Sequence, residues 1–297
     1  MRRIGTIAFL ILAALAAQGA PHRAAGEEAG ATAKPAEATC DRAAFRLVID
    51  VGHTPQVPGA KSARGLKEFD FNLRLAKLVE QQLVEAGFAK TVLLVTEGPA
   101  LLSLARRVAR ADALHPDLLL SIHHDSVPDS FLEKWEYNGE KHSFSDRFKG
   151  HSLFVSYGNR DRKGSLLFAR LLGLALKSRG LAYTPHYTEK FMGRRRRELI
   201  DPEAGVYRYD QLVVLMYPHM PAVLLEAGSI INRDEELAMG TPERQAAISA
   251  AVLEAVEGFC KERRPVPPER MAHPNAPAKA RLRPAAARAP ASAAKPQ

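Results

Sequence analysis

The sequence predicts an α/β fold: a single domain with a mostly parallel, twisted sheet that is covered by helices on both faces. Two observations favour this class. Apolar runs of strand length alternate along the chain with longer segments whose apolar residues recur at helical spacing. One of the runs, residues 118–123, is almost continuously apolar, which is typical of a strand covered on both faces of a sheet.

Five strands and four helices are expected in this alternation. The expected strands are residues 45–50, 91–96, 118–123, 151–157 and 222–226. The expected helices begin at Asp70, Leu101, Ser165 and Thr241, and the first and third of them end at Gly87 and Gly180. Polar side chains such as those of Asp and Thr cap helix N-termini, Pro242 fits a first helical position, and glycine commonly ends a helix.

Two polar segments interrupt the alternation, residues 127–150 and residues 184–210. The second contains four consecutive arginines, Arg194 to Arg197. This run is either an anion-binding element or a solvated loop, and a run of like charges is more often the latter.

The net charge of the 297 residues is +9, but it is concentrated at the two ends of the chain. Residues 261–297 alone hold nine Lys and Arg against two Glu. Nucleic-acid enzymes usually carry positive charge on the folded body, so no nucleic-acid partner is expected.

The two ends of the chain are not expected to belong to the folded domain. Residues 1–20 combine two arginines with an apolar run and small residues, the pattern of a cleaved secretory signal peptide. The alternative is a membrane anchor, but the apolar run is shorter than the roughly 20 residues that a spanning helix needs, so no stable anchor is expected. We expect a disordered linker at 21–42, a catalytic domain at 43–262 and a disordered basic, Pro/Ala-rich tail at 263–297. The protein should then act in the periplasm or cell envelope.

Cys40 and Cys260 are the only cysteines, and they lie at the two edges of the expected domain. In an exported protein such a pair indicates a disulfide that joins the ends of the domain. The alternative is two independent buried thiols.

Polar side chains gather where the expected strands end. His53 follows the first strand, His123 ends the third, and Glu226 ends the last, while Glu68 precedes the helix that begins at Asp70. Ligands of parallel α/β sheets bind at the carboxyl ends of strands. Two imidazoles and a carboxylate with an open fourth position are typical of catalytic zinc, and a second carboxylate suits a general base.

Each of these residues also has a simpler interpretation. His53 could be an ordinary turn histidine, and Glu68 a solvated charge near a helix N-terminus. His123 and His124 point to opposite faces of a strand, so the residues alone do not decide between them. Glu226 is the most informative, because it ends a run that should be buried, where carboxylates are rare unless paired or bound to a cation.

Four motifs occur in one order along the chain. They are Val48-Ile-Asp-Val-Gly-His53, Glu68-x-x-x-Asn72, Ser121-Ile-His-His-Asp125 and Leu225-Glu-Ala-Gly-Ser-Ile-Ile-Asn232. Together they resemble the zinc-dependent N-acetylmuramoyl-L-alanine amidases, the cell-wall hydrolase family that contains the bacterial division amidases. The resemblance runs from about residue 45 to residue 259.

The resemblance implies one Zn²⁺ per chain, bound by His53, Glu68 and His123, with Glu226 as the catalytic carboxylate. It implies a substrate-binding role for Arg107 and Asn72. It also implies hydrolysis of the amide between N-acetylmuramoyl and L-Ala of peptidoglycan, in wall remodelling or daughter-cell separation.

Division amidases can be blocked by a segment that an activator protein removes. Residues 127–150 are the nearest candidate for such a segment here, and Glu133, Glu136 or Glu140 would then occupy the open metal position. Two other functions remain open: a zinc peptidase that cleaves peptidoglycan stem peptides, and a non-catalytic cell-wall binding protein on the same fold.

Overall fold

A computed structural model describes residues 40–263. The expected signal peptide, most of the expected linker and the tail from residue 264 lie outside the described residues. Within residues 40–263, no helix combines the length and apolar character needed to cross a bilayer.

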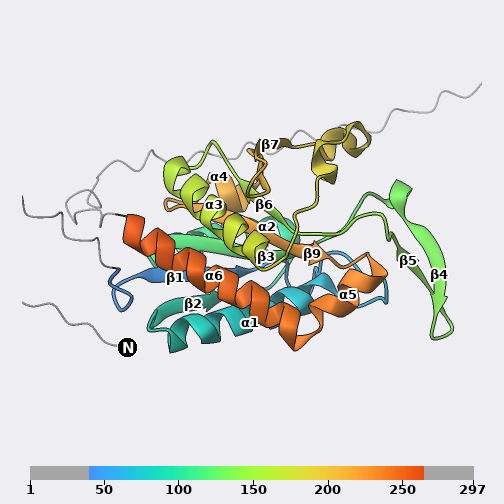
Figure 1. Cartoon of the computed structure of the whole chain (residues 1–297), viewed down its shortest axis with the longest axis horizontal. Helices are drawn as coiled ribbons and strands as arrows, with labels where there is room; N and C mark the ends of the chain where they lie inside the picture. Colours follow the sequence, from blue (N-terminus) through green and yellow to red (C-terminus); the bar gives the residue numbers. More distant parts are fainter. Residues whose placement is uncertain (1–39, 264–297) are drawn as a thin grey trace, which may run out of the picture. The chain divides into compact units, whose positions relative to one another are not determined.

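A mixed, mostly parallel seven-stranded sheet forms the centre of the domain, as the sequence predicts (Figure 1). In spatial order its strands are β2 (Lys90–Leu94), β1 (Arg46–Val51), β3 (Leu118–Asp125), β9 (Ala222–Ser229), β6 (Ser152–Val155), β8 (Val206–Arg208) and β7 (Glu198–Asp201). The first four strands run parallel to one another, and so do β6 and β8. The pairs β9–β6 and β8–β7 are antiparallel.

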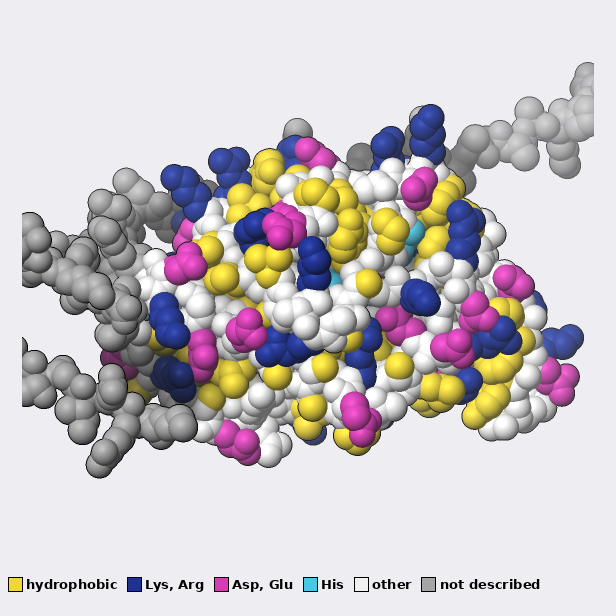
Figure 2. Space-filling view, in the orientation of Figure 1, with side chains coloured by type: hydrophobic (Ala, Val, Ile, Leu, Met, Phe, Trp, Pro, Cys, Tyr) yellow, Lys and Arg dark blue, Asp and Glu magenta, His cyan; other side chains and the backbone are white. Residues whose placement is uncertain are grey.

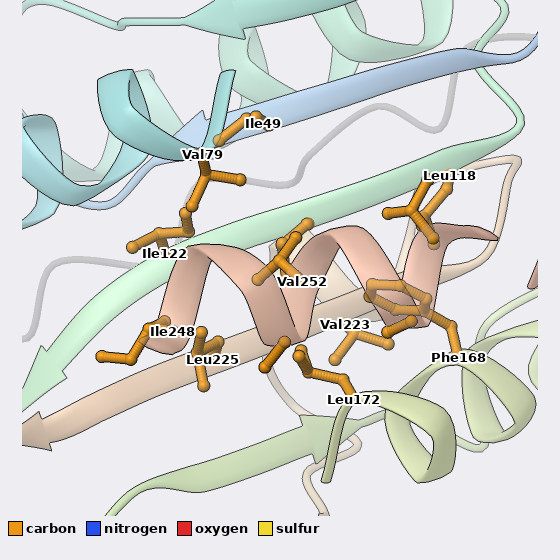
Figure 3. Packing of buried hydrophobic residues seen from close by; sticks show 14 of the residues in the cluster. Ile49, Val79, Leu118, Ile122, Phe168, Leu172, Val223, Leu225, Ile248 and Val252 are labelled. Carbon is orange, nitrogen blue, oxygen red and sulfur yellow. The ribbon is translucent and has the colours of Figure 1, made fainter. Parts of the chain in front are cut away.

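Helices cover both faces of this sheet. The larger core lies under α1 (Glu68–Glu85), α3 (Arg162–Ser178) and α6 (Pro242–Glu262), where alternate strand residues such as Ile122 and Leu225 meet Val79 and Val252 (Figure 3). The opposite face packs on α2 (Ala100–Ala113) and α4 (Val213–Met216). Both faces are therefore apolar, which explains the continuous apolar run in the sequence of β3.

Two expected helix starts are wrong. Helix α1 begins at Glu68 rather than after Asp70, with Lys67 in the N-cap position and no side-chain cap. Helix α3 begins at Arg162, because Asp161 accepts a hydrogen bond from the Gly164 amide and so caps the helix before Ser165. The expected cap at Thr241 is confirmed by its side-chain hydrogen bond to the Arg244 amide.

Both polar insertions contain structure that the sequence did not predict. Residues 127–150 contain a 3-10 turn (Asp129–Phe131) and the antiparallel hairpin of β4 (Glu133–Tyr137) and β5 (Glu140–Phe144). Residues 184–210 contain two 3-10 turns (His186–Thr188 and Lys190–Arg195) and strands β8 and β7, of which β7 is the edge strand of the sheet. The short helix α5 (Arg233–Met239) follows β9.

Candidate functional site

His53 lies just beyond β1, in a turn whose backbone carbonyls accept hydrogen bonds from a buried arginine. Its backbone is left-handed, with φ of 67°, a conformation that non-glycine residues adopt only where surrounding structure fixes it. Arg107 donates to the carbonyl oxygens of Val51 (2.7 Å) and His53 (2.6 Å) and pairs with Asp50 at 3.0 Å. Arg107 is only 2% exposed, and in the structure its guanidinium supports the His53 turn.

Three side chains that could hold a metal ion meet at the carboxyl ends of the strands. The side chain of Glu68 comes from the first turn of α1 and that of His123 from β3. Glu68 Oε1 lies 2.9 Å from His53 Nε2 and 3.1 Å from His123 Nδ1, and one donor atom from each residue lies within 4.8 Å of the others. Burial would raise the pKa of Glu68, but hydrogen bonds from the two histidines outweigh it, and the pKa is well below its usual range.

Two imidazoles and one carboxylate converging in this way fit a zinc ion with an open coordination position. Two glycines leave room for the rings. A Cβ at Gly52 would lie 2.5 Å from the His123 ring, and one at Gly59 would lie 2.6 Å from the His53 ring. The donor set and the glycines beside it therefore agree with a metal site at these three residues.

His124 and Asn72 support this group from the other side of β3. His124 Nδ1 lies 2.7 Å from Asn72 Oδ1, and the Asn72 amide donates to the carbonyl of Gly52 at 3.2 Å. Burial lowers the pKa of His124 to about 3, so its ring stays neutral. Both side chains are buried and bonded to each other, and His124 does not belong to the group of three possible metal ligands.

Glu226 lies beside His123, because these two residues are partners in the β3–β9 register. Its side chain is half-buried, and its Oε2 has no hydrogen-bond partner within residues 40–263. Burial raises the pKa of Glu226 well above its usual range, and the negative charges of Asp125 and Glu68 add to this effect. A carboxylate with one free oxygen and a high proton affinity is suited to accept and return a proton.

Tyr187 is a site neighbour that sequence reasoning missed. Its hydroxyl donates to both carboxylate oxygens of Asp125, at 2.8 and 2.9 Å, two residues after His123. Tyr187 belongs to the second polar insertion. No motif in the sequence marks it, and only the fold brings its hydroxyl to Asp125. The ring of Tyr187 stacks on that of His186, with 4.3 Å between the two ring centroids.

The glutamates of the first insertion are not at the metal-binding group. Glu133, Glu136 and Glu140 are exposed on the β4–β5 hairpin, and among the described residues the group that could hold a metal ion consists of His53, Glu68 and His123. The expectation that one of these glutamates occupies the open position is therefore wrong for this structure. The strands of the hairpin pair with each other rather than with the central sheet.

Comparisons with known proteins agree with this geometry. Residues 47–258 match the family model described as N-acetylmuramoyl-L-alanine amidase. The amidase AmiC of Neisseria meningitidis serogroup B is 26% identical over 225 residues, which cover 72% of this chain and 52% of AmiC.

Two solved structures show the same fold. The amidase Ami1 of Mycobacterium smegmatis aligns with a TM-score of 0.56 and 18% identity, covering 74% of this chain and 99% of Ami1. The CwlD amidase of Clostridioides difficile, solved in complex with the GerS lipoprotein, aligns with a TM-score of 0.50 and 16% identity, covering 72% of this chain and 98% of CwlD. Since the family model spans most of the described domain, the chain belongs to the N-acetylmuramoyl-L-alanine amidase family of cell-wall hydrolases.

Proposed function

We propose that the chain is a zinc-dependent amidase that hydrolyses the amide between the lactyl group of N-acetylmuramic acid and L-Ala of peptidoglycan. In this proposal His53, Glu68 and His123 hold one Zn²⁺, and Glu226 is the catalytic carboxylate. The observation that supports it most is the convergence of these three donors beside a carboxylate with one free oxygen. Family membership supplies the substrate class.

The chain's own residues have distinct tasks in this reaction. Bound zinc supplies Lewis acidity, which polarises the scissile carbonyl and lowers the pKa of water. Glu226 Oε2 takes a proton from the attacking water and returns it to the L-Ala nitrogen as that amine leaves. Arg107 and Asn72 hold the backbone on which His53 stands, through the carbonyls of His53 and Gly52.

Two rival functions use the same fold. A zinc peptidase acting on stem peptides would have the same metal ligands with another groove. A non-catalytic wall-binding protein would be expected to lack a ligand or the base, whereas all four residues are present and assembled here. The intact constellation favours an enzyme.

We propose that the protein is exported and acts in the periplasm or cell envelope on peptidoglycan. The support is the signal-peptide pattern of residues 1–20, which lie outside the described residues, and the wall substrate of the family. An activator protein is part of the proposal as well, since one structural neighbour was solved with a lipoprotein partner.

Purified protein should contain about one zinc per chain and should release peptides with a free L-Ala amine from peptidoglycan. Metal analysis and mass spectrometry of the soluble products test both statements. Release of single amino acids would identify the peptidase instead. Wall binding without any soluble product, in zinc-loaded protein, would identify the binding protein.

A further inference from the structure

The two polar insertions meet beside the candidate active site. Phe191 of the second insertion packs on Phe131 (4.9 Å between ring centroids) and Phe148 (5.8 Å) of the first. His186 adds a further contact, with its ring 5.0 Å from that of Phe148. Figure 1 shows both insertions, the β4–β5 hairpin and the olive 3-10 turns, at the end of the molecule where β3 and β9 finish.

The two insertions together form a wall, and hydrogen bonds connect this wall to the candidate site. The Arg197 amide donates to the Tyr187 carbonyl at 2.8 Å, and the Tyr187 hydroxyl binds Asp125, two residues after the ligand candidate His123. Arg196 is held as well, because its Nε donates to the carbonyl of Thr188 at 2.8 Å. The arginine run is mostly exposed, as its composition favours, but its last two residues are bonded to this wall.

The four arginines of the run divide into two kinds. Arg196 and Arg197 are engaged: Arg197 bonds backbone carbonyls and lies over the Tyr209 ring at 3.7 Å. Arg194 and Arg195 are exposed, and their guanidinium groups have no hydrogen-bond or ion-pair partner within residues 40–263.

Arg147 of the first insertion adds a third exposed guanidinium to this wall. It lies over the Phe191 ring at 4.6 Å and, in the described part of the chain, no carboxylate pairs with it. Figure 2 shows that dark blue Lys and Arg side chains are spread over the visible face of the molecule and alternate there with Asp and Glu. We name Arg147, Arg194 and Arg195 the arginine wall.

We propose that the arginine wall binds the free carboxylates of the peptidoglycan stem peptide and so makes the enzyme prefer acidic over amidated stems. This inference rests on the proposed amidase function. In the proposed reaction the stem peptide begins at the L-Ala nitrogen that receives the proton from Glu226, and the residues that follow L-Ala carry carboxyl groups. Arginine binds carboxylates through paired, directional N–H donors, and guanidinium groups without an internal partner are available for this.

The test compares two soluble muropeptides that differ only in having free or amidated stem carboxylates. Wild-type enzyme should cleave the free form with a kcat/KM about 10-fold higher, mostly through KM, since exposed charge-assisted hydrogen bonds are modest in strength. The variant Arg194→Gln/Arg195→Gln should lose about that factor on the free form and little on the amidated form. Arg147→Gln should show a smaller loss of the same kind.

The matched control removes two other exposed charges, Lys77 on α1 and Lys177 on α3, as Lys77→Gln/Lys177→Gln. It should cleave both substrates like wild type, and all variants should keep the wild-type melting temperature. Equal losses on both substrates, or a loss only on whole sacculi, would overturn carboxylate recognition; the second result would indicate binding to a wall polyanion. If wild type cleaves neither muropeptide, the proposed function fails, whereas equal cleavage of both by wild type and variant rejects the arginine wall alone.

Discussion

Glu226 differs from the three ligand candidates in what its oxygens contact. Glu68 is bound on both sides by imidazoles, whereas Glu226 Oε2 has no hydrogen-bond partner in the described chain. We therefore expect Glu226→Gln to keep zinc nearly stoichiometric while muropeptide turnover falls about 10²–10⁴-fold, because the amide keeps the shape but accepts no proton. His53→Ala and His123→Ala should lose zinc and activity together. Substantial zinc loss from Glu226→Gln would instead make Glu226 a ligand, and unchanged turnover would refute the mechanism.

Gly52 is the residue at which the smallest change should disturb the metal site. A methyl group there would lie 2.5 Å from the His123 ring, so the ring must move. We expect Gly52→Ala to weaken zinc binding about 10–100-fold, as loss of ligand support commonly does. Gly258→Ala is the matched control, since its Cβ would meet only Leu171 at an ordinary 3.4 Å. Competition with a chromophoric chelator measures both; equal zinc affinity in the two variants would contradict the expectation.

The sequence indicates the candidate metal ligands and Glu226 better than it indicates the residues that hold them in place. His53, His123 and Glu226 follow from where polar residues end apolar strands, and the structure brings the two histidines together with Glu68. Arg107 was expected to face substrate because a sequence position conveys residue type but not exposure. Its guanidinium is directed to backbone carbonyls, which no motif encodes.

At the scale of elements, the last helix depends on a cap that the sequence shows plainly. The Thr241 hydroxyl accepts a hydrogen bond from the Arg244 amide at 3.2 Å, ahead of a 21-residue helix that contacts both α1 and α3. We expect Thr241→Ala to lower the free energy of unfolding by about 1 kcal/mol. Urea unfolding with an unchanged slope measures this, and Thr241→Ser should restore most of the loss. A Thr241→Ala protein as stable as wild type would show that packing alone fixes the start of α6.

Long apolar elements were predictable and short polar ones were not. Strands β1, β3 and β9 are buried on both faces. Nearly every position in them is therefore apolar, and the run is visible in the sequence. Strands β7 and β8 have only four and three residues, and runs this short leave no periodic pattern to detect. The cap of α3 was missed because Asp161 lies four residues before the serine that looks like a helix start.

At the scale of the whole domain, the Cys40–Cys260 pair and the candidate site lie at opposite ends of the strands. Strand β1 begins near Cys40 and finishes before His53, while α6 runs back and places Cys260 beside the start (Figure 1). The structure links Cys40 and Cys260 by a disulfide, with 5.1 Å between their Cα atoms. This bond encloses almost the entire catalytic domain and lies away from the metal-binding residues.

That separation predicts a change in stability without a change in catalysis. A cross-link over a separation of 220 residues restricts the unfolded chain strongly, so Cys40→Ser/Cys260→Ser should lower the free energy of unfolding by about 2–5 kcal/mol. Muropeptide turnover at 25 °C should stay near that of wild type, because the candidate site lies at the other end of the strands from the disulfide. A reductant should lower the melting temperature of wild type and leave the double variant unchanged, which separates the bond from side-chain packing. Two free thiols found by mass spectrometry in exported, non-reduced protein would refute the disulfide. A loss of turnover in the still-folded variant would show that the disulfide and the candidate site are coupled.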